Sequence, residues 1–231
     1  MKILSQLKWQ LMLLHKNNII NISIGVTVIY GVILFLIKDV GSLDVVLISI
    51  VLNDPSVIGY FFIALAIYTE IKHEILPAIF TTPINLHHYI ISKVMALSVV
   101  GIVCALGLAF FVKGFDFDII NYAIGTLGIC LLSALLGLIM LTFASEFLKF
   151  AMISIPVFLT FINVPLLQYL GVFDMGLLKY VFPAQGSINL IDNGISGTEI
   201  NLWATYISIF FWITLFYSLA YKLFKRKVIC Q

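Results

Sequence analysis

The residues best suited to chemistry lie together between Glu70 and Lys93, in the segment EIKHEILPAIFTTPINLHHYIISK. His73, His87 and His88 all fall in it, close to carboxylates and lysines. Imidazole and carboxylate groups can hold a metal or move protons, but the spacing of these histidines matches no zinc motif. We therefore interpret them as histidines at a membrane interface and expect no metal site.

Motifs of ATP-binding and hydrolytic sites are absent from the chain: it has no G-x-x-x-x-G-K-[ST], no H-E-x-x-H and no G-x-S-x-G. Ionisable residues are scarce at the centres of the apolar stretches, where ion-coupled transporters keep their relays. Cys104, Cys130 and Cys230 are far apart and suggest neither a metal nor a disulfide framework. We expect no catalysis by this chain, so energy for any active transport must come from elsewhere.

The composition is that of an integral membrane protein. Of 231 residues, 62% are hydrophobic and 10% are charged, against about 25% charged in soluble domains. A membrane helix needs about 20 apolar residues, which predicts an all-α fold with six spans at 19–37, 45–69, 88–112, 119–144, 151–172 and 202–224. The first apolar stretch is too long for a cleavable signal peptide and no A-x-A site follows it, so we expect it to be retained.

Residues 1–17 differ from the following transmembrane domain, 18–231. Apolar residues recur at helical spacing among lysines and glutamines, which predicts an amphipathic helix lying at the bilayer surface. Within the transmembrane domain, Asn53-Asp54-Pro55 interrupts the second apolar stretch. This predicts either a short helix before the second span or a break near its outer end.

The longest connection, 173–201, mixes glycines with apolar side chains, and predicts short interfacial or re-entrant helices. Its apolar residues are too many for a solvated loop. We expect Pro183 and Gly186 to set a turn between two helical pieces.

Lysine and arginine sort strongly between the two sides of this topology. One side collects Lys2, Lys8, Lys16, Lys72, Lys93, Lys149, Lys222, Lys225, Arg226 and Lys227. The other collects Lys38, Lys113 and Lys179. Because basic residues favour the cytoplasmic side, we expect both termini and the 70–88 connection in the cytoplasm. Most acidic residues, Asp54 among them, are assigned to the outer side.

The 70–88 connection itself predicts a short helix near 74–81. Pro77 suits a first helical turn and Pro83 ends the helix. Leu76, Ile79 and Phe80 share one face, which predicts either an apolar surface for a partner's groove or a helix resting on lipid.

The 70–93 segment carries an acidic residue closing span two (Glu70), then Leu76, Thr82-Pro83, and Tyr89 with Ser92-Lys93 opening span three. Two further motifs are NDPSVIGYFF (53–62) and FPAQGSINLI (182–191). These motifs and their order resemble those of type-2 ABC exporter permeases, and within them the fluoroquinolone-export-type subunits.

The resemblance implies a permease without an ATP site of its own. The helix at 1–17 then corresponds to an elbow helix, and 70–88 to a coupling loop that contacts a separate ATPase subunit, which binds the ATP and magnesium. The ATPase-coupling residues would be Glu70, Glu74, Leu76, Ile79, Phe80, Thr82 and Pro83. This chain departs from the family at one point: it has Glu74-Ile75 where the family usually has Gly-Thr. Glycine adopts a positive φ without strain and Glu74 does not, so the entry to the coupling helix is expected to differ. A second permease chain, identical or similar, would complete the transporter.

The resemblance also places the translocation path beside spans one, two and five. Candidates for lining it are Asn21, Thr27, Tyr60, Phe62, Phe158, Phe161 and Asn163. The aromatic residues could instead pack in the core or face lipid, and Asn163 could bond a neighbouring helix or a carbonyl freed by proline. On span four, Gly125, Gly128, Ser133 and Gly137 predict close helix packing.

These observations together predict the membrane subunit of an ATP-driven exporter in a prokaryotic plasma membrane. The cargo would be amphipathic or apolar: a drug, a peptide or a lipid. The alternatives are a peptide immunity or sensing permease of the same family, or a membrane-embedded lipid-modifying enzyme. The expected partners are ATPase subunits, a second permease chain and membrane lipids, and no nucleic acid.

Overall fold

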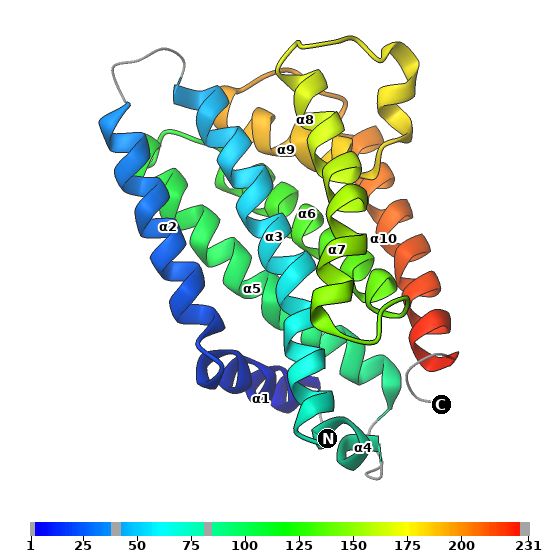
Figure 1. Cartoon of the computed structure of the whole chain (residues 1–231). Helices are drawn as coiled ribbons and strands as arrows, with labels where there is room; N and C mark the ends of the chain where they lie inside the picture. Colours follow the sequence, from blue (N-terminus) through cyan, green and yellow to red (C-terminus); the bar gives the residue numbers. More distant parts are fainter. Residues whose placement is uncertain (1–2, 38–42, 81–84, 227–231) are drawn as a thin grey trace.

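The computed structural model describes residues 3–37, 43–80 and 85–226, and the regular secondary structure in these ranges is entirely helical (Figure 1). Six helical segments in them are long and apolar enough to cross a membrane. The all-α, six-span prediction is therefore confirmed, and the chain is a multi-pass membrane protein. In lipid a helix satisfies every backbone group internally, which is why apolar length translates directly into helices.

The helical elements follow the expected order. They are α1 (Ile3–Lys16), α2 (Ile19–Leu36), α3 (Leu43–Lys72), α4 (Ile75–Phe80), α5 (Leu86–Lys113), α6 (Ile119–Leu141), α7 (Phe147–Phe158), η1 (Leu159–Asn163), α8 (Val164–Tyr169), η2 (Gly176–Val181), α9 (Pro183–Ser196) and α10 (Leu202–Phe224). Figure 1 shows α1, α4 and the last turns of α10 at one end of the bundle, called here the α4 end. Helices α8 and α9 lie at the other end, called the α9 end.

Helix α6 is the centre of the bundle and packs against α3, α5, α9 and α10. A Cβ at Gly137 would clash with the carbonyl oxygen of Tyr60 on α3. One at Gly125 would lie 2.9 Å from Leu190 Cβ on α9. The small residues of this span thus allow close backbone approach, as predicted.

Helix α3 continues without a break through Pro55, so the predicted interruption of the second span is wrong. Proline removes the bond that would close on the Val51 carbonyl, yet nearby polar side chains hold the turn together. Asn53 Nδ2 donates to the Ser49 carbonyl at 3.1 Å, and the Ser56 hydroxyl donates to the Leu52 carbonyl. Asp54 therefore lies inside the span.

The fifth span is helical from Phe147 to Tyr169 but changes its winding at the centre. A π-helical turn, Leu159–Asn163, separates α7 from α8, with Pro156 before it and Pro165 after it. The two prolines remove backbone donors on either side of this turn. The helix of the fifth span is therefore irregular at its centre.

The 173–201 region forms ordered helical pieces, as predicted, with η2 followed by the largely buried α9. Pro183 begins α9, but Gly186 lies within it, so the predicted turn at Gly186 is wrong. A Cβ at Gly186 would lie 2.8 Å from Ile209 Cγ1, which shows that this glycine lets α9 approach α10.

Hydrogen bonds between polar side chains join the helices at the α9 end. Asn121 Nδ2 donates to Asn193 Oδ1 at 2.8 Å, and the Tyr206 hydroxyl donates to Asn121 Oδ1. The Tyr169 hydroxyl donates to Asp192 Oδ1 at 2.9 Å. Side-chain hydrogen bonds thus connect α6, α8, α9 and α10 at the α9 end.

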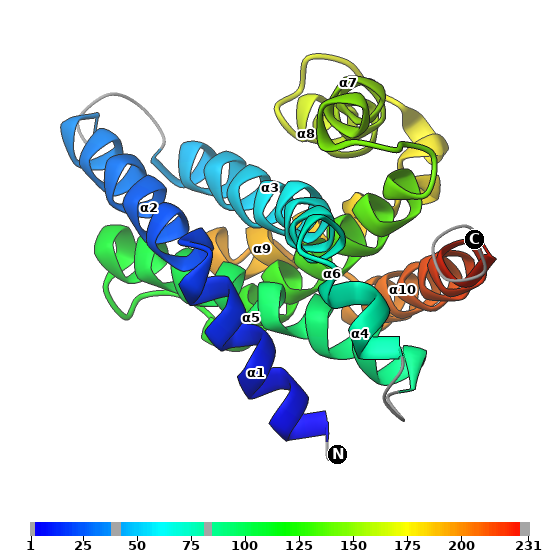
Figure 2. The same cartoon turned by 60° about the horizontal axis from the view of Figure 1, so that its bottom comes forward.

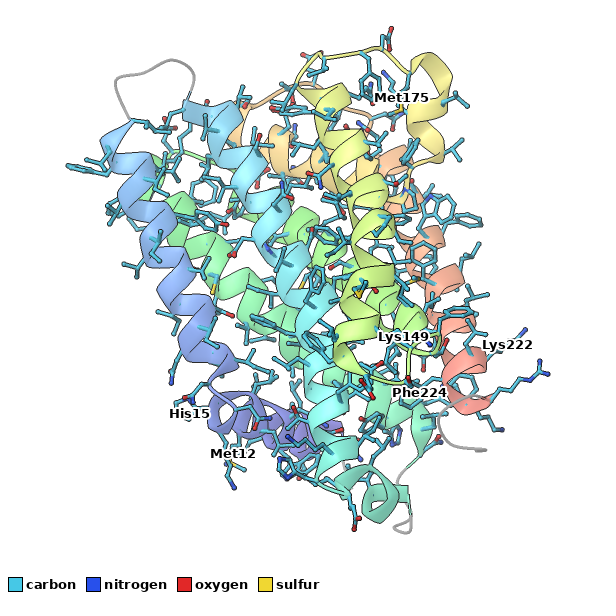
Figure 3. All side chains as sticks on the ribbon, viewed as in Figure 1. Met12, His15, Lys149, Met175, Lys222 and Phe224 are labelled. Atoms are coloured by element: carbon cyan, nitrogen blue, oxygen red, sulfur yellow. The ribbon has the colours of Figure 1, made fainter. Side chains whose placement is uncertain are left out.

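Helix α1 lies across the α4 end and packs along α5 (Figure 2). Its buried face carries Gln6 and Gln10 beside Leu14, whereas Leu4 is 78% exposed. Figure 3 shows Met12 and His15 directed away from the bundle. The helix is amphipathic as expected, but two glutamines share the face that meets the protein.

Candidate functional site

A buried charged cluster joins the two ends of the connection that holds α4. Glu70 Oε1 on α3 lies 2.6 Å from Lys93 Nζ on α5, with side-chain exposures of 5% and 2%. The Tyr89 hydroxyl donates to Glu70 Oε2 at 2.5 Å, and Lys93 Nζ lies 5.0 Å from the centre of the Tyr89 ring. We call Glu70, Tyr89 and Lys93 the Glu70 cluster. Both carboxylate oxygens are used, so the cluster ties α3 rigidly to α5.

Aromatic side chains connect the Glu70 cluster to α10. Phe224, which is fully buried and directed into the bundle in Figure 3, stacks on Tyr89 at 6.2 Å. His87 stacks on Tyr221 at 4.0 Å, and its Nδ1 lies 2.7 Å from the Tyr217 hydroxyl. His87 is thus a packing residue between α5 and α10.

Helix α4 forms at the predicted place, but its apolar side chains are not presented outward. Leu76 and Ile79 are buried, 5% and 7% exposed, and α4 packs against α3. The expectation that these two side chains form an exposed docking face is therefore wrong in this structure. The Phe80 side chain, and the whole of Thr82 and Pro83, lie outside the described residues. The ATPase-coupling role of this loop stays a prediction.

Glu74, at the entry to α4, has φ 55°. Its N–H bonds the Ile71 carbonyl at 3.1 Å, which closes the turn between α3 and α4. The chain therefore makes the left-handed turn that the sequence comparison with Gly-Thr left in doubt, and it does so with a glutamate. A non-glycine residue in this region costs roughly 1–2 kcal/mol.

The expected aromatic wall is mostly interior packing between α3 and α7. Tyr60 is fully buried, and its ring lies 5.2 Å from Phe158 and 5.9 Å from Phe150. The Tyr60 hydroxyl donates to the Ser154 carbonyl at 3.3 Å. Tyr60 and Phe158 therefore do not line an open path here; the packing alternative holds for them.

The remaining path candidates are scattered rather than gathered. Asn21 is exposed on α2 and donates to Asn18, and Thr27 donates to the Ser23 carbonyl of its own helix. Phe161 packs on α10, 5.4 Å from Phe216. Asn163 is half-buried and makes no hydrogen bond through its side chain with the part of the chain that the structure describes.

Two of the path candidates border cavities: Phe161 lies beside an open hollow with Pro156 and Thr160, and Phe62 borders a cavity between α2 and α3. The cavity measures about 240 Å³ and is also bordered by Ser23, Tyr30, Asp54 and Val57. Sequence reasoning missed Asp54 as a site residue because it placed the span's break at Pro55. The apolar residues on both sides of Asn53-Asp54 were the signal that this carboxylate could lie within the span.

A second, polar cavity of about 340 Å³ opens at the α9 end between η2, α9 and α10. Gln185, Asn189 and Glu199 line it. Gln185 donates to Asn189 at 3.0 Å, so its polar groups are partly engaged with each other.

Basic side chains concentrate at the α4 end. Figure 3 shows Lys149 and Lys222 there, and both are exposed. Lys8, Lys16, Lys72, Lys225 and Arg226 belong to elements at the same end, whereas Lys113 and Lys179 are near the α9 end. The charge asymmetry expected from the sequence is therefore present on the folded chain.

Six membrane-length helices, two of them joined by the short helix α4, define this chain as a multi-pass membrane protein. The whole chain, residues 1–231, matches the fluoroquinolones export permease protein family. The chain belongs to that family, and so to the membrane permeases of exporters.

The curated relatives include the fluoroquinolones export permease proteins of two Mycobacterium tuberculosis strains, CDC 1551 / Oshkosh and ATCC 25618 / H37Rv. This chain is 25% identical to each over 155 residues, which cover 67% of this chain and 65% of the relative. The match thus spans just under two thirds of the relatives' own length.

Proposed function

We propose that this chain is the membrane-spanning subunit of an ATP-driven exporter that moves an amphipathic or apolar cargo outward across a prokaryotic plasma membrane. The observation that carries this proposal is membership of an export permease family over the whole chain. The relatives are fluoroquinolones export permease proteins by name, which makes a fluoroquinolone-like drug one candidate cargo. ATP and magnesium would be bound by a separate ATPase subunit, and this chain would work as a transport subunit without catalysis of its own.

The α4 end is proposed to face the cytoplasm and receive the ATPase. The exposed lysines there support this orientation, because positively charged loops favour the cytoplasmic side. Ile71, next to α4, is 42% exposed and offers an apolar contact that Leu76 and Ile79 do not. A partner would then touch the junction between α3 and α4 rather than the buried face of α4.

The Glu70 cluster would transmit the movement of the ATPase. Helix α4 lies in the connection between Glu70 and Lys93, and an ion pair joins these two residues. A force on α4 therefore acts on α3 and α5 together. Helix α3 in turn packs on α2 and α7, so its displacement would change both flanks of the bundle.

A second permease chain is proposed to meet this one along the α2 and α7 flanks. Few residues of these two spans are buried within the chain: the buried share is 22% for α2 and 33% for the Phe147–Tyr169 span. Figures 1 and 2 both show α3 lying between α2 and α7. Helix α10 is also only 22% buried, and would face lipid.

The proposal is tested by purifying the chain from its native membranes and measuring vanadate-sensitive ATP hydrolysis in nanodiscs, with the P-loop subunit identified by mass spectrometry. Ile71→Asp should lower the yield of co-purified ATPase several-fold. Phe115→Asp places the same charge at another exposed apolar residue, near the α9 end, and should leave the yield unchanged. A wild-type chain that purifies without any P-loop ATPase, or equal yields from both variants, would contradict the proposal.

A further inference from the structure

The cavity between α2 and α3 contains a carboxylate that the mechanism above does not use. Asp54 borders this space of about 240 Å³, and the residue is only 6% exposed. Its Oδ2 has no hydrogen-bond partner among the described residues. Since α3 runs from Leu43 to Lys72, Asp54 lies about 5 Å along the axis from the middle of that helix.

An isolated carboxylate at this depth is costly unless it is neutralised or paired. Two ion pairs occur within the described ranges, and they engage Lys93 with Glu70 and Lys113 with Asp44. Neither involves Asp54. The described part of the chain therefore supplies no cation to this carboxylate.

The cavity has the size and lining of a site for an organic cation rather than a metal ion. Its volume equals about eight water molecules at roughly 30 Å³ each, far more than a single bare ion fills. Tyr30 and Phe62 contribute aromatic rings, and Val26 and Val57 contribute apolar surface. A carboxylate, aromatic rings and aliphatic side chains together suit an alkylammonium group on an apolar body.

We propose that Asp54 and this cavity bind the ammonium group of a cationic amphiphile, and so select positively charged cargo. The inference rests on the proposed export function for its physiological meaning, because it names a cargo class. The binding step itself needs only this chain. A failure of ATPase association would count against the export proposal and not against this site.

The test uses the purified chain in nanodiscs and tritiated benzyltrimethylammonium as the probe. The wild-type chain should bind it saturably, and Asp54→Asn should weaken binding at least about ten-fold, because a charged contact in a water-poor site is lost. Asp116→Asn makes the same chemical change at an exposed aspartate outside the cavity and should have no effect. Neopentylbenzene, the neutral carbon isostere, should compete at least about ten-fold more weakly than the unlabelled probe.

A second variant keeps the carboxylate and fills the space. Val26→Phe should abolish probe binding while leaving thermal unfolding close to that of the wild type, because Val26 is only partly buried. Undiminished binding in either Asp54→Asn or Val26→Phe would overturn the proposal. Displacement of the probe by sodium chloride but not by potassium chloride would assign the site to a metal ion, and would overturn it too.

Discussion

Glu70 and Lys93 meet at 2.6 Å across the base of the connection that carries α4. A second pair, Asp44 and Lys113, joins the same two helices near the α9 end at 2.8 Å. The first pair is almost fully buried, whereas the side chains of the second are 35% and 23% exposed. Helices α3 and α5 are thus pinned at both ends, with the stronger constraint beside α4.

Removing one member of the buried pair should destabilise the bundle. Glu70→Gln leaves Lys93 charged and buried without its counter-ion, at a cost of about 3–5 kcal/mol. The double variant Glu70→Gln with Lys93→Met should recover part of this loss, because no unpaired charge remains. Thermal unfolding in detergent measures both.

The matched control is Asp44→Asn, which breaks the half-exposed pair between the same helices. Its effect should stay near 1 kcal/mol or below, since solvent screens this contact. Equal losses in Glu70→Gln and Asp44→Asn would show that burial does not strengthen the Glu70 pair.

The left-handed turn at Glu74 should accept glycine readily. Glu74→Gly should be neutral or stabilise the fold by up to about 1 kcal/mol, because glycine adopts a positive φ without strain. Glu74→Val should destabilise it, since a β-branched residue is poorly suited to this region. Unfolding midpoints of the two variants that fall in the opposite order would refute this explanation of the turn.

Close packing of α6 on α3 should make Gly137 intolerant of a side chain. Gly137→Ala places a methyl group against the Tyr60 carbonyl and should cost about 1–3 kcal/mol. Gly107→Ala on α5 meets nothing within 4 Å and should be neutral or slightly stabilising. A fluorescence-detected stability assay compares the two variants. A loss in Gly137→Ala alone would assign the effect to the close approach of α6 and α3, whereas equal losses would contradict this explanation.

The α4 end should be cytoplasmic. In a Cys230→Ser background, a cysteine replacing exposed Ser5 should react with an impermeant maleimide only after the membrane is opened. A cysteine replacing exposed Asp116 should react in intact cells. Cys104 and Cys130 are buried and should stay unlabelled. The reverse labelling pattern would show that the topology is inverted and that the proposed ATPase face is not cytoplasmic.

The active complex should contain two permease chains. Native mass spectrometry from nanodiscs should show two copies, or one copy with a similar permease, and a cysteine replacing exposed Val28 on α2 should cross-link between them. Helix pairing in lipid depends on close contact, because lipid removes the hydrophobic drive. Transport by complexes with a single permease chain would exclude the proposed α2 and α7 interface.

The sequence by itself determined the class of fold, the six spans and the closeness of α6 to its neighbours. Apolar length sets where a helix can cross a bilayer, because lipid offers the backbone no other hydrogen-bond partner. The small residues of α6 are likewise a local signal. The helix around Leu76 was predictable from spacing and flanking prolines, although the direction of its buried face was not.

Only the tertiary structure decided which side chains meet. Helical periodicity shows that Glu70 and Lys93 lie near helix ends, but not that their side chains face each other across the α3–α5 contact. The sequence alone favours an outer position for Asp54, because proline often ends a helix and Pro55 follows it directly. Packing on α5, where Gly101 leaves room for Pro55, accommodates the proline within α3 and leaves Asp54 buried at mid-span beside a cavity. The reason is physical: spacing along one helix determines its faces, whereas the partner of each face depends on how all six helices fill the same volume.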